Sequence, residues 1–437
     1  MKCPVAHTSA TQLLSGEFAR YPYPDFAILQ EQGGVHQVED LPWYLVTGHQ
    51  TCVEVLRNPN AFITEHKNFG QALTAIGIAP SPEIYARMKE IGGQRGNMVD
   101  TIPHRDGPAH ARQRRLVTKA ITSQFYKWEG FIEAQTAHLL NCFDGRPKVD
   151  AVSEIAVPLP IAVIADILGV ANEHLPNIKR WSDDASRTSG RRSSEEDWER
   201  QARSMAAMRA LFSAEMRKRL EHPSDDLIGS FAAATLEPRD PQSGDEPLGF
   251  DEAVELATVL LLAGNETTTQ SLASLLYHLA VQPDLLERVR NDESIINKVV
   301  EEAVRLASPI VSMMRFCRQE TEVAGVVIPA GAIVSVCFNQ ANRDPKIFGH
   351  PDEFDETREK LSQHLAFGNG GHICPGAPLA RLEGRILLKQ LSRKLKGVRL
   401  AGQDAVRYDW ASLAVRGMTN LGITYELLDK VRASEQE

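Results

Sequence analysis

The chain has 437 residues, of which 43% are hydrophobic and 6% are aromatic, and its formal net charge is −9. The negative charge and the scarcity of aromatic side chains argue against a general nucleic-acid binder, and no apolar run reaches the ~18 residues of a membrane-spanning helix. The apolar content suffices for a large core. Because no repeat, low-complexity tract or linker divides the chain, we expect residues 1–437 to form a single large domain.

The cysteines show no paired spacing that would indicate a disulfide framework or a second half of a metal site. There are six of them: Cys3, Cys52, Cys142, Cys317, Cys337 and Cys374. The N-terminus has no apolar segment of signal-peptide length. These features favour a reducing compartment, and we expect a soluble, cytoplasmic monomer with no membrane anchor.

Hydrophobic periodicity predicts a mainly α-helical chain with small β-sheets. Residues 35–46 indicate a β-hairpin that turns near Asp40. Residues 60–105 form a long mixed segment, for which a functional loop is expected. Helices are expected at 107–125, then through about residue 235, and at 250–280, 294–306 and 377–395. An exposed loop is expected at 236–249, and strands at 311–337 and 397–427.

The most informative segment is Phe-Gly-Asn-Gly-Gly-His-Ile-Cys-Pro-Gly, residues 367–376. It places Cys374 between a glycine-rich turn and a helix, with Pro375 suited to the first helical position. The positive end of the helix dipole favours a thiolate. The glycines allow a flat, bulky group to approach the backbone. An anionic sulfur beneath a planar ligand is what a haem-thiolate iron requires. The alternative is a buried structural cysteine.

A second unusual segment is Ala-Gly-Asn-Glu-Thr-Thr-Thr, residues 263–269, in the centre of the helix at 250–280. Gly264 costs a helix about 1 kcal/mol relative to alanine. The hydroxyl of Thr267 can bond back to a carbonyl one turn earlier. A buried acid such as Glu266 in an apolar helix needs a reason, which is either a salt bridge or a function.

The segment 367–376 resembles the cysteine-ligand loop of the cytochrome P450 family, with Phe367, Gly370, His372, Cys374 and Gly376 at the positions of that pattern. The resemblance covers nearly the whole chain. It implies the cytochrome P450 fold and a haem b whose iron is bound by Cys374. Phe367 and Gly368 are then part of the cofactor-binding loop.

Residues 263–267 resemble the oxygen-activation motif of the same family. The resemblance implies that Ala263 and Gly264 leave room for dioxygen beside the cofactor. Thr267 is then expected to hydrogen-bond the oxygen, and Glu266 to relay protons to it with water.

The resemblance also assigns cations to the haem propionates, since carboxylates need charge-assisted partners. These are His110, Arg114, Arg315 and His372, and the alternative for each is an ordinary surface charge. The pair Glu302 and Arg305, spaced three apart on a helix, is expected to form a buried structural triad with Arg358.

Family topology places several segments around the substrate: parts of 70–104, 180–195, 259–267, 310–314 and 414–419. The side chains expected in the pocket are Val259, Leu262, Val311, Met313 and Met418. They indicate an apolar, adaptable pocket for a small-to-medium substrate such as a terpenoid, alkyl-aromatic, steroid or fatty acid. The stretch from Arg187 to Arg192 either contacts a substrate carboxylate or is a solvated loop.

The function implied is that of a monooxygenase that takes O2 and two electrons. No dinucleotide-binding fingerprint is present, and no fused reductase is expected, so a ferredoxin with its NAD(P)H-dependent reductase is the expected donor. A basic cluster at Arg112, Arg115 and Lys119 either docks that acidic donor or is a solvated face. The alternatives are a peroxide-driven enzyme, against which Glu266 and Thr267 argue, and a haem-binding sensor without turnover.

Overall fold

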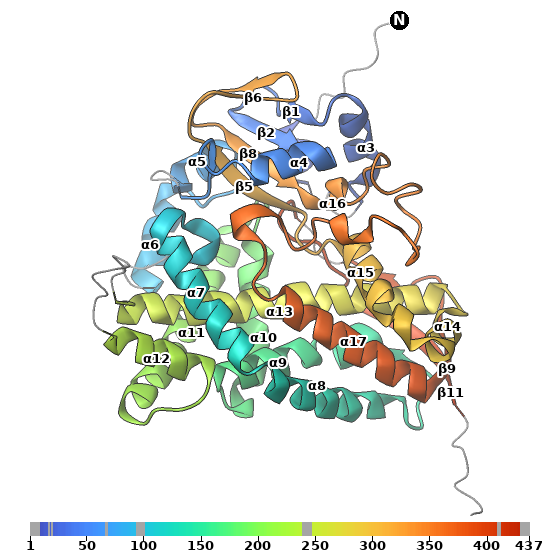
Figure 1. Ribbon diagram of the computed structural model, residues 1–437. Coiled ribbons are helices and arrows are strands. Elements are labelled where there is room, and N and C mark those ends of the chain that lie inside the picture. The colour runs from blue at the N-terminus through green and yellow to red at the C-terminus, as the bar shows by residue number, and fades with distance from the viewer. Residues whose placement is uncertain are drawn as a thin grey trace, which may run out of the picture.

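The computed structural model describes residues 9–15, 18, 21–65, 69–92, 101–237, 247–408 and 412–428. A body of helices fills most of the molecule, and a β-sheet built from both halves of the chain lies at one end of it, at the top in Figure 1. Most of the predicted loop at 236–249, and residues 93–100 of the predicted substrate-pocket segment 70–104, lie outside the described residues.

The helices account for most of the predicted elements with boundaries shifted by a few residues. The segment 60–105, predicted as a functional loop, contains two helices, α5 and α6. In chain order the helices are α1 (Ala10–Leu13), α3 (Tyr23–Glu31), α4 (His49–Leu56), α5 (Phe69–Ala75), α6 (Pro82–Gly92), α7 (Gly107–Ser123), α8 (Phe125–Leu139), α9 (Pro158–Leu168), α10 (Leu175–Thr188), α11 (Glu195–Glu221), α12 (Leu227–Leu236), α13 (Phe250–Val281), α14 (Leu285–Asn291), α15 (Ile296–Ala307), α16 (Phe338–Ala341) and α17 (Ala377–Lys394).

The strands form one five-stranded sheet, one four-stranded sheet and one two-stranded ribbon among the described residues. The strands are β1 (Val35–Gln37), β2 (Trp43–Val46), β3 (Phe62–Ile63), β4 (Val149–Asp150), β5 (Ser312–Cys317), β6 (Thr321–Val323), β7 (Val326–Ile328), β8 (Ile333–Cys337), β9 (Leu395–Leu400), β10 (Val406–Arg407) and β11 (Asn420–Leu427). The predicted hairpin is confirmed as β1 and β2, which pair antiparallel with Val35 opposite Val46.

The five-stranded sheet has the order β1-β2-β8-β5-β3. Its β2 and β8 run parallel, whereas the other neighbours are antiparallel. All five residues of β8 are buried, as its β-branched sequence Ile-Val-Ser-Val-Cys suggests for an interior strand. The sheet therefore joins the N-terminal hairpin to the segment that follows α15.

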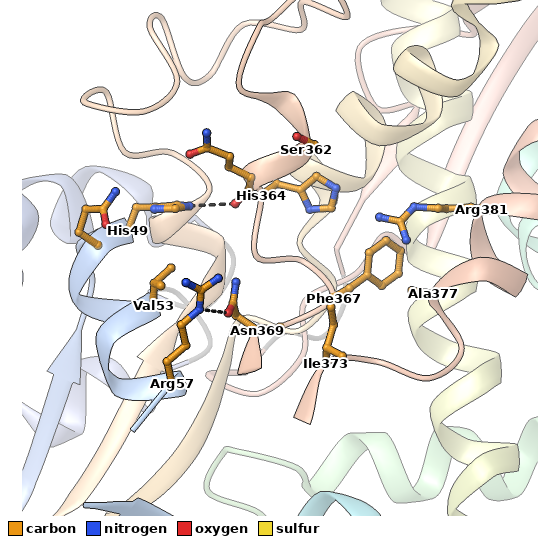
Figure 2. A pocket seen from close by; sticks show the side chains of 13 residues that line it. His49, Val53, Arg57, Ser362, His364, Phe367, Asn369, Ile373, Ala377 and Arg381 are labelled. Atoms are coloured by element: carbon orange, nitrogen blue, oxygen red, sulfur yellow. Dashed lines mark hydrogen bonds between the residues drawn. The ribbon is translucent and has the colours of Figure 1, made fainter. Parts of the chain in front are cut away.

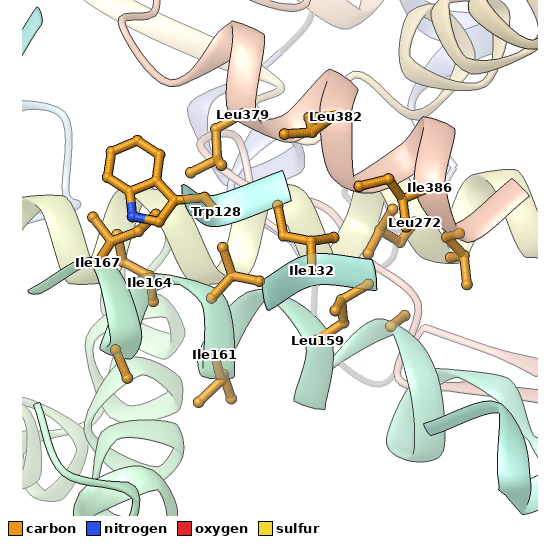
Figure 3. Packing of buried hydrophobic residues seen from close by; sticks show 14 of the residues in the cluster. Trp128, Ile132, Leu159, Ile161, Ile164, Ile167, Leu272, Leu379, Leu382 and Ile386 are labelled. Atoms are coloured by element: carbon orange, nitrogen blue, oxygen red, sulfur yellow. The ribbon is translucent and has the colours of Figure 1, made fainter. Parts of the chain in front are cut away.

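The helix α13 is the central support of the body, at 32 residues and about 48 Å from a rise of 1.5 Å per residue. Its first turn is closed by Glu252, whose carboxylate accepts the N–H of Gly249 (3.3 Å). Helices α9 and α17 pack against it, and α8 packs on both of them, through apolar side chains that include Trp128, Ile132 and Leu272 (Figure 3). No helix of the described residues is both long enough and apolar enough to cross a lipid bilayer.

Candidate active site

The loop before α17 holds Cys374 by its backbone. The N–H of Cys374 donates to the carbonyl of Phe367 (2.8 Å). Gly368 and Gly370 have φ angles of +74° and +69°, which favour glycine. At Gly370 a Cβ atom would lie 2.4 Å from the carbonyl oxygen of Leu56, at the end of α4. The loop can follow this path against α4 because residue 370 has no side chain.

Protein closely surrounds Cys374, although its surface is exposed. Burial raises the pKa of the Cys374 thiol. Hydrogen bonds from the backbone of Gly376 and Ala377, and the charges of Arg114 and Arg381, act in the opposite direction but are outweighed. A thiol bound to a metal ion loses its proton outright.

The helix N-terminus therefore contributes less than the sequence indicated. The backbone at the helix N-terminus does lower the pKa of the thiol, as expected, but the desolvation of the sulfur raises that pKa by more. Pro375 was assigned to the first helical position, and this is wrong, because α17 begins at Ala377.

Three cationic side chains near the loop have no anionic partner in the described part of the chain. Nε2 of His110 and Nη1 of Arg114 are buried and make no hydrogen bond there. Arg315 is 5% exposed and donates from Nη1 to the carbonyl of Met314 on its own strand (2.9 Å). Buried donors are nearly always paired, so this set indicates an anionic group that binds between them.

The electrostatics of these groups lead to the same conclusion. The pKa of His110 is lowered to about 4, first by burial and then by the nearby charges of His372, Arg114 and Arg315. The pKa of Arg315 is lowered to about 10 by burial. Burial thus disfavours the positive charges of His110 and Arg315, the charge of Asp106 offsets this only in part, and two propionate carboxylates would meet the remaining need. The donor set fits a haem beside Cys374.

His372 differs from the other three, because it already has a carboxylate partner. Its Nε2 lies 3.2 Å from an oxygen of Asp106, and its ring lies against that of His110 with centroids 4.1 Å apart. Asp106 also accepts the N–H groups of Thr64 and Glu65, each at 2.7 Å. Burial alone would raise the pKa of Asp106, but these hydrogen bonds hold it well below its usual range. Asp106 orients His372, and our sequence analysis did not identify it.

One face of α13 is open although the helix is buried along most of its length. Ala263 is exposed and Thr267, one turn later, is half-buried. The hydroxyl of Thr267 donates to the carbonyl of Ala263 (2.7 Å), the back-bonding that the sequence suggested. At Gly264 a Cβ atom would approach Ile164 to 3.1 Å. Gly264 therefore also serves the packing of α9 on α13.

Glu266 lies on a closed side of the same helix, 7% exposed. Burial raises its pKa, and a hydrogen bond from Gln270 opposes that rise. Nε2 of Gln270 donates to Glu266 (2.9 Å), while Oε1 of Gln270 accepts the N–H of Met418 (2.7 Å). A Cβ atom at Gly417 would lie 2.1 Å from the Gln270 side chain. Gln270 thus joins the acid to the segment at 417–418. Nothing in its local sequence reveals this long-range contact.

The five predicted pocket residues differ in exposure. Leu262 and Met313 are half-buried, whereas Val259, Val311 and Met418 are buried. The segment that carries Met418 also meets the turn after α10. There the N–H of Leu413 donates to the carbonyl of Gly190 (3.3 Å), which places the Arg187–Arg192 stretch beside residues 412–415.

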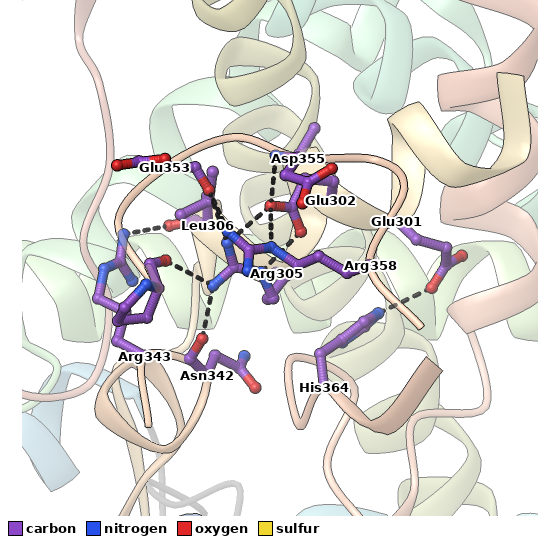
Figure 4. A network of polar contacts seen from close by, with 12 residues as sticks. Glu301, Glu302, Arg305, Leu306, Asn342, Arg343, Glu353, Asp355, Arg358 and His364 are labelled. Atoms are coloured by element: carbon purple, nitrogen blue, oxygen red, sulfur yellow. Dashed lines mark hydrogen bonds and ion pairs between the residues drawn. The ribbon is translucent and has the colours of Figure 1, made fainter. Parts of the chain in front are cut away.

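The triad of Glu302, Arg305 and Arg358 meets in the interior (Figure 4). Arg305 donates to Glu302 from Nε and Nη2 (2.6 and 2.7 Å), and Arg358 donates from Nε (3.0 Å). The side chains of Glu302 and Arg305 are fully buried.

A pocket lies beside the cysteine loop (Figure 2). Its volume is about 370 Å³, and its walls come from α4, the loop and the start of α17, including Arg57, Phe367, Asn369 and Arg381.

The predicted donor-docking cluster on α7 is only partly available to a partner. Arg112 is held by Glu252 and by the carbonyl of Pro247, whereas Lys119 is exposed.

Known proteins have this fold and are similar to this chain in sequence. The family model described as Cytochrome P450 matches residues 188–396. Cytochrome P450 107B1 of Saccharopolyspora erythraea is 32% identical over 93% of this chain and 95% of its own. The 6-deoxyerythronolide B hydroxylase of the same organism is 36% identical over 73% of this chain and 76% of its own. The crystal structure of P450BioI in complex with hexadec-9Z-enoic acid ligated acyl carrier protein covers 94% of this chain and all of its own, at 27% identity and a TM-score of 0.80.

The chain belongs to the cytochrome P450 family. It has the cytochrome P450 fold, mainly α-helical with small sheets, and is a P450 monooxygenase. The cofactor of this family is haem b with a cysteine thiolate on its iron.

We expect Gly370→Ala to destabilise the protein because alanine at a positive φ costs about 1–2 kcal/mol and the carbonyl of Leu56 must also move. The midpoint of thermal unfolding should fall. Gly371→Ala is the matched control, since a Cβ at that neighbouring glycine meets nothing within 4 Å. Equal midpoints for the two variants would show that the loop does not depend on its approach to α4.

We expect Glu302→Gln to cost roughly 3–5 kcal/mol, because it leaves the charges of Arg305 and Arg358 buried without a carboxylate. The free energy of unfolding measured in urea tests this. Glu426→Gln is the control: Glu426 pairs with Lys396 at 3.6 Å on the surface and should contribute less than about 1 kcal/mol. Similar losses in both variants would contradict the assignment.

Proposed function

We propose that Cys374 supplies the thiolate ligand of a haem-dependent monooxygenase that hydroxylates, dealkylates or epoxidises a small-to-medium apolar substrate. The observation that carries the proposal is the set of buried groups without a salt-bridge partner, His110, Arg114 and Arg315, near a Cys374 whose surface is exposed. A structural cysteine needs no such set.

The residues that hold the cofactor divide into two groups. His110, Arg114 and Arg315 bind the propionates, and His372, oriented by Asp106, lies beside them. Phe367 and the glycines of the loop bring Cys374 to its position. Haem b, when bound, supplies the iron at which O2 is activated, and the thiolate adds electron density that favours O–O cleavage.

Thr267 and Glu266 are the residues that would hold and deliver protons at the open face of α13. The hydroxyl proton of Thr267 is committed to the carbonyl of Ala263, so its oxygen lone pairs can accept a proton donor such as water and hold it near the open face of α13. Glu266 has a raised pKa and can therefore carry a proton at a higher pH than an exposed glutamate. Nε2 of Gln270 donates to the carboxylate of Glu266 and fixes it, which makes Gln270 a positioning residue for the relay.

The apolar pocket residues bear on the substrate, and the cationic side chains near the cysteine loop bear on the electron donor. The half-buried Leu262 and Met313 and the buried Val259, Val311 and Met418 favour an apolar substrate. One similar protein is a 6-deoxyerythronolide B hydroxylase. Two electrons per turnover come from a separate donor. We propose a ferredoxin with its NAD(P)H-dependent reductase, because the loop side of the molecule presents cations such as Arg57 and Arg381 to an acidic partner.

We expect the dithionite-reduced protein to give a strongly red-shifted Soret band with carbon monoxide, since that shift reports a thiolate on the iron. Cys374→Ser should lose the shift while Cys142→Ser keeps it, because Cys142 follows α8 and packs against the main hydrophobic core. A band at the ordinary histidine-haem position in the unmodified protein would overturn the role of Cys374. Absence of any haem band after reconstitution would overturn the proposal.

We expect Thr267→Ala to consume reductant without product and to release peroxide, because the water that delivers the proton is no longer held. The measurement is product and peroxide per NAD(P)H, with a substrate chosen from terpenoids, alkyl-aromatics, steroids and fatty acids by its spin-state shift. Thr267→Ser keeps a hydroxyl and should retain most of the coupling. An unchanged product yield in Thr267→Ala would remove Thr267 from the mechanism.

A further inference from the structure

Glu301, the neighbour of the triad glutamate, joins two elements that meet at the cysteine loop. Its carboxylate accepts Nε and Nη2 of Arg381 from α17 (2.5 and 3.0 Å). The same carboxylate lies 2.7 Å from Nε2 of His364, three residues before Phe367. Figure 4 shows Glu301 and His364 side by side, apart from the triad. None of these three side chains binds a propionate or takes part in the proton relay described above.

Arg381 continues this network to the ring that precedes the cysteine. Its guanidinium carbon lies 4.4 Å from the centroid of the Phe367 ring, and both side chains form part of the wall of the pocket in Figure 2. The carbonyl of Phe367 accepts the N–H of Cys374. The positive charge of Arg381 therefore lies against the residue whose carbonyl holds the backbone of Cys374.

The pair contributes to stability as well as to the local charge. The side chains of Arg381 and Glu301 are 34% and 20% exposed. Burial alone would raise the pKa of Glu301, but its hydrogen bonds with His364 and Arg381 lower that pKa to about 2. Both charges lie beside the loop that holds Cys374, at a place where water screens them only in part.

We propose that Arg381 and Glu301 are positioning residues that set the reduction potential of the iron bound to Cys374, Arg381 favouring the reduced state and Glu301 offsetting that effect. The inference rests on the proposed function, since it requires the iron. Reduction adds one electron to the site and neither forms nor breaks a bond, so the charge at the site falls by one. A nearby positive charge stabilises that product and a nearby negative charge destabilises it.

The two residues should therefore shift the potential in opposite directions. Glu301→Gln leaves the charge of Arg381 without its offset and should raise the potential. Arg381→Gln should lower it. We expect each change to alter the ratio of reduced to oxidised protein about threefold at a fixed applied potential, which is about 30 mV for a one-electron couple. The double variant should return close to the unmodified protein.

The experiment is an anaerobic, dye-mediated redox titration of the substrate-free holoenzyme, followed by its Soret band. Glu293→Gln is the matched control, because Glu293 pairs with Arg393 at the other end of α17 (2.7 Å) and loses the same charge. Arg381→Lys keeps the charge and should leave the potential close to that of the unmodified protein, whereas loss of packing on Phe367 would shift Arg381→Lys and Arg381→Gln alike.

Opposite shifts in Glu301→Gln and Arg381→Gln, with none in Glu293→Gln, support the proposal. Shifts of the same sign, or no larger than that of the control, overturn it while the carbon monoxide spectrum still shows a thiolate. If Glu301→Gln fails to retain haem, the comparison of Arg381→Gln with Arg381→Lys decides alone. Absence of the thiolate spectrum in the unmodified protein overturns the proposed function and this inference together.

Discussion

The buried carboxylate of Glu302 is the constraint on which the position of the cysteine loop depends. It accepts Arg305 and Arg358 and also the backbone N–H of Asp355 (2.9 Å). Arg305 in turn donates to the carbonyl of Asn342 (2.7 Å), and the side chain of Asn342 accepts the N–H of Leu365 (2.5 Å). A chain of hydrogen bonds therefore runs from α15 to a residue two positions before Phe367. A buried ion pair is weak support for stability in itself. Here, however, Glu302 also accepts a backbone N–H, and Arg305 also donates to the carbonyls of Asn342, Pro351 and Glu353, so the pair fixes irregular backbone.

The cofactor site affects the stability of the fold as well as the chemistry of the protein. His110, Arg114 and Arg315 are brought together by α7 and β5, elements about 200 residues apart in sequence. Nε2 of His110 and Nη1 of Arg114 have no hydrogen-bond partner in the described structure, and Arg315 donates only to the carbonyl of Met314 there. Their mutual repulsion and desolvation oppose folding until an anion binds. Folding and haem binding are consequently linked, because a ligand that binds only the folded state stabilises it. The exposed sulfur of Cys374 and the cationic set near it are both explained by one bound group, the haem.

The sequence was sufficient for those features that depend on local pattern. The hairpin at 35–46, the helix at 250–280 and the cysteine segment 367–376 are each set by periodicity or by a short motif, and the structure has these elements close to the predicted boundaries. Contacts between distant elements were not predictable in this way. Asp106 faces His372 across 266 residues and Gln270 reaches Met418 across 148, and neither carries a local signal. The net effect of burial on Cys374 was also missed, because desolvation depends on packing that a motif does not describe.

Glu301 and Glu302 show how adjacent residues can serve different purposes. Successive residues of an α-helix point about 100° apart, so Glu302 faces the interior and the triad while Glu301 faces α17 and the loop. The first arrangement needs complete burial, since an exposed carboxylate would not hold three segments in place. The second is only partly buried, so that Glu301 can pair with Arg381 without the desolvation that full burial would impose. The helix α15 thus provides, at two consecutive positions, the support of the cysteine loop and a counter-charge to the arginine that acts on it.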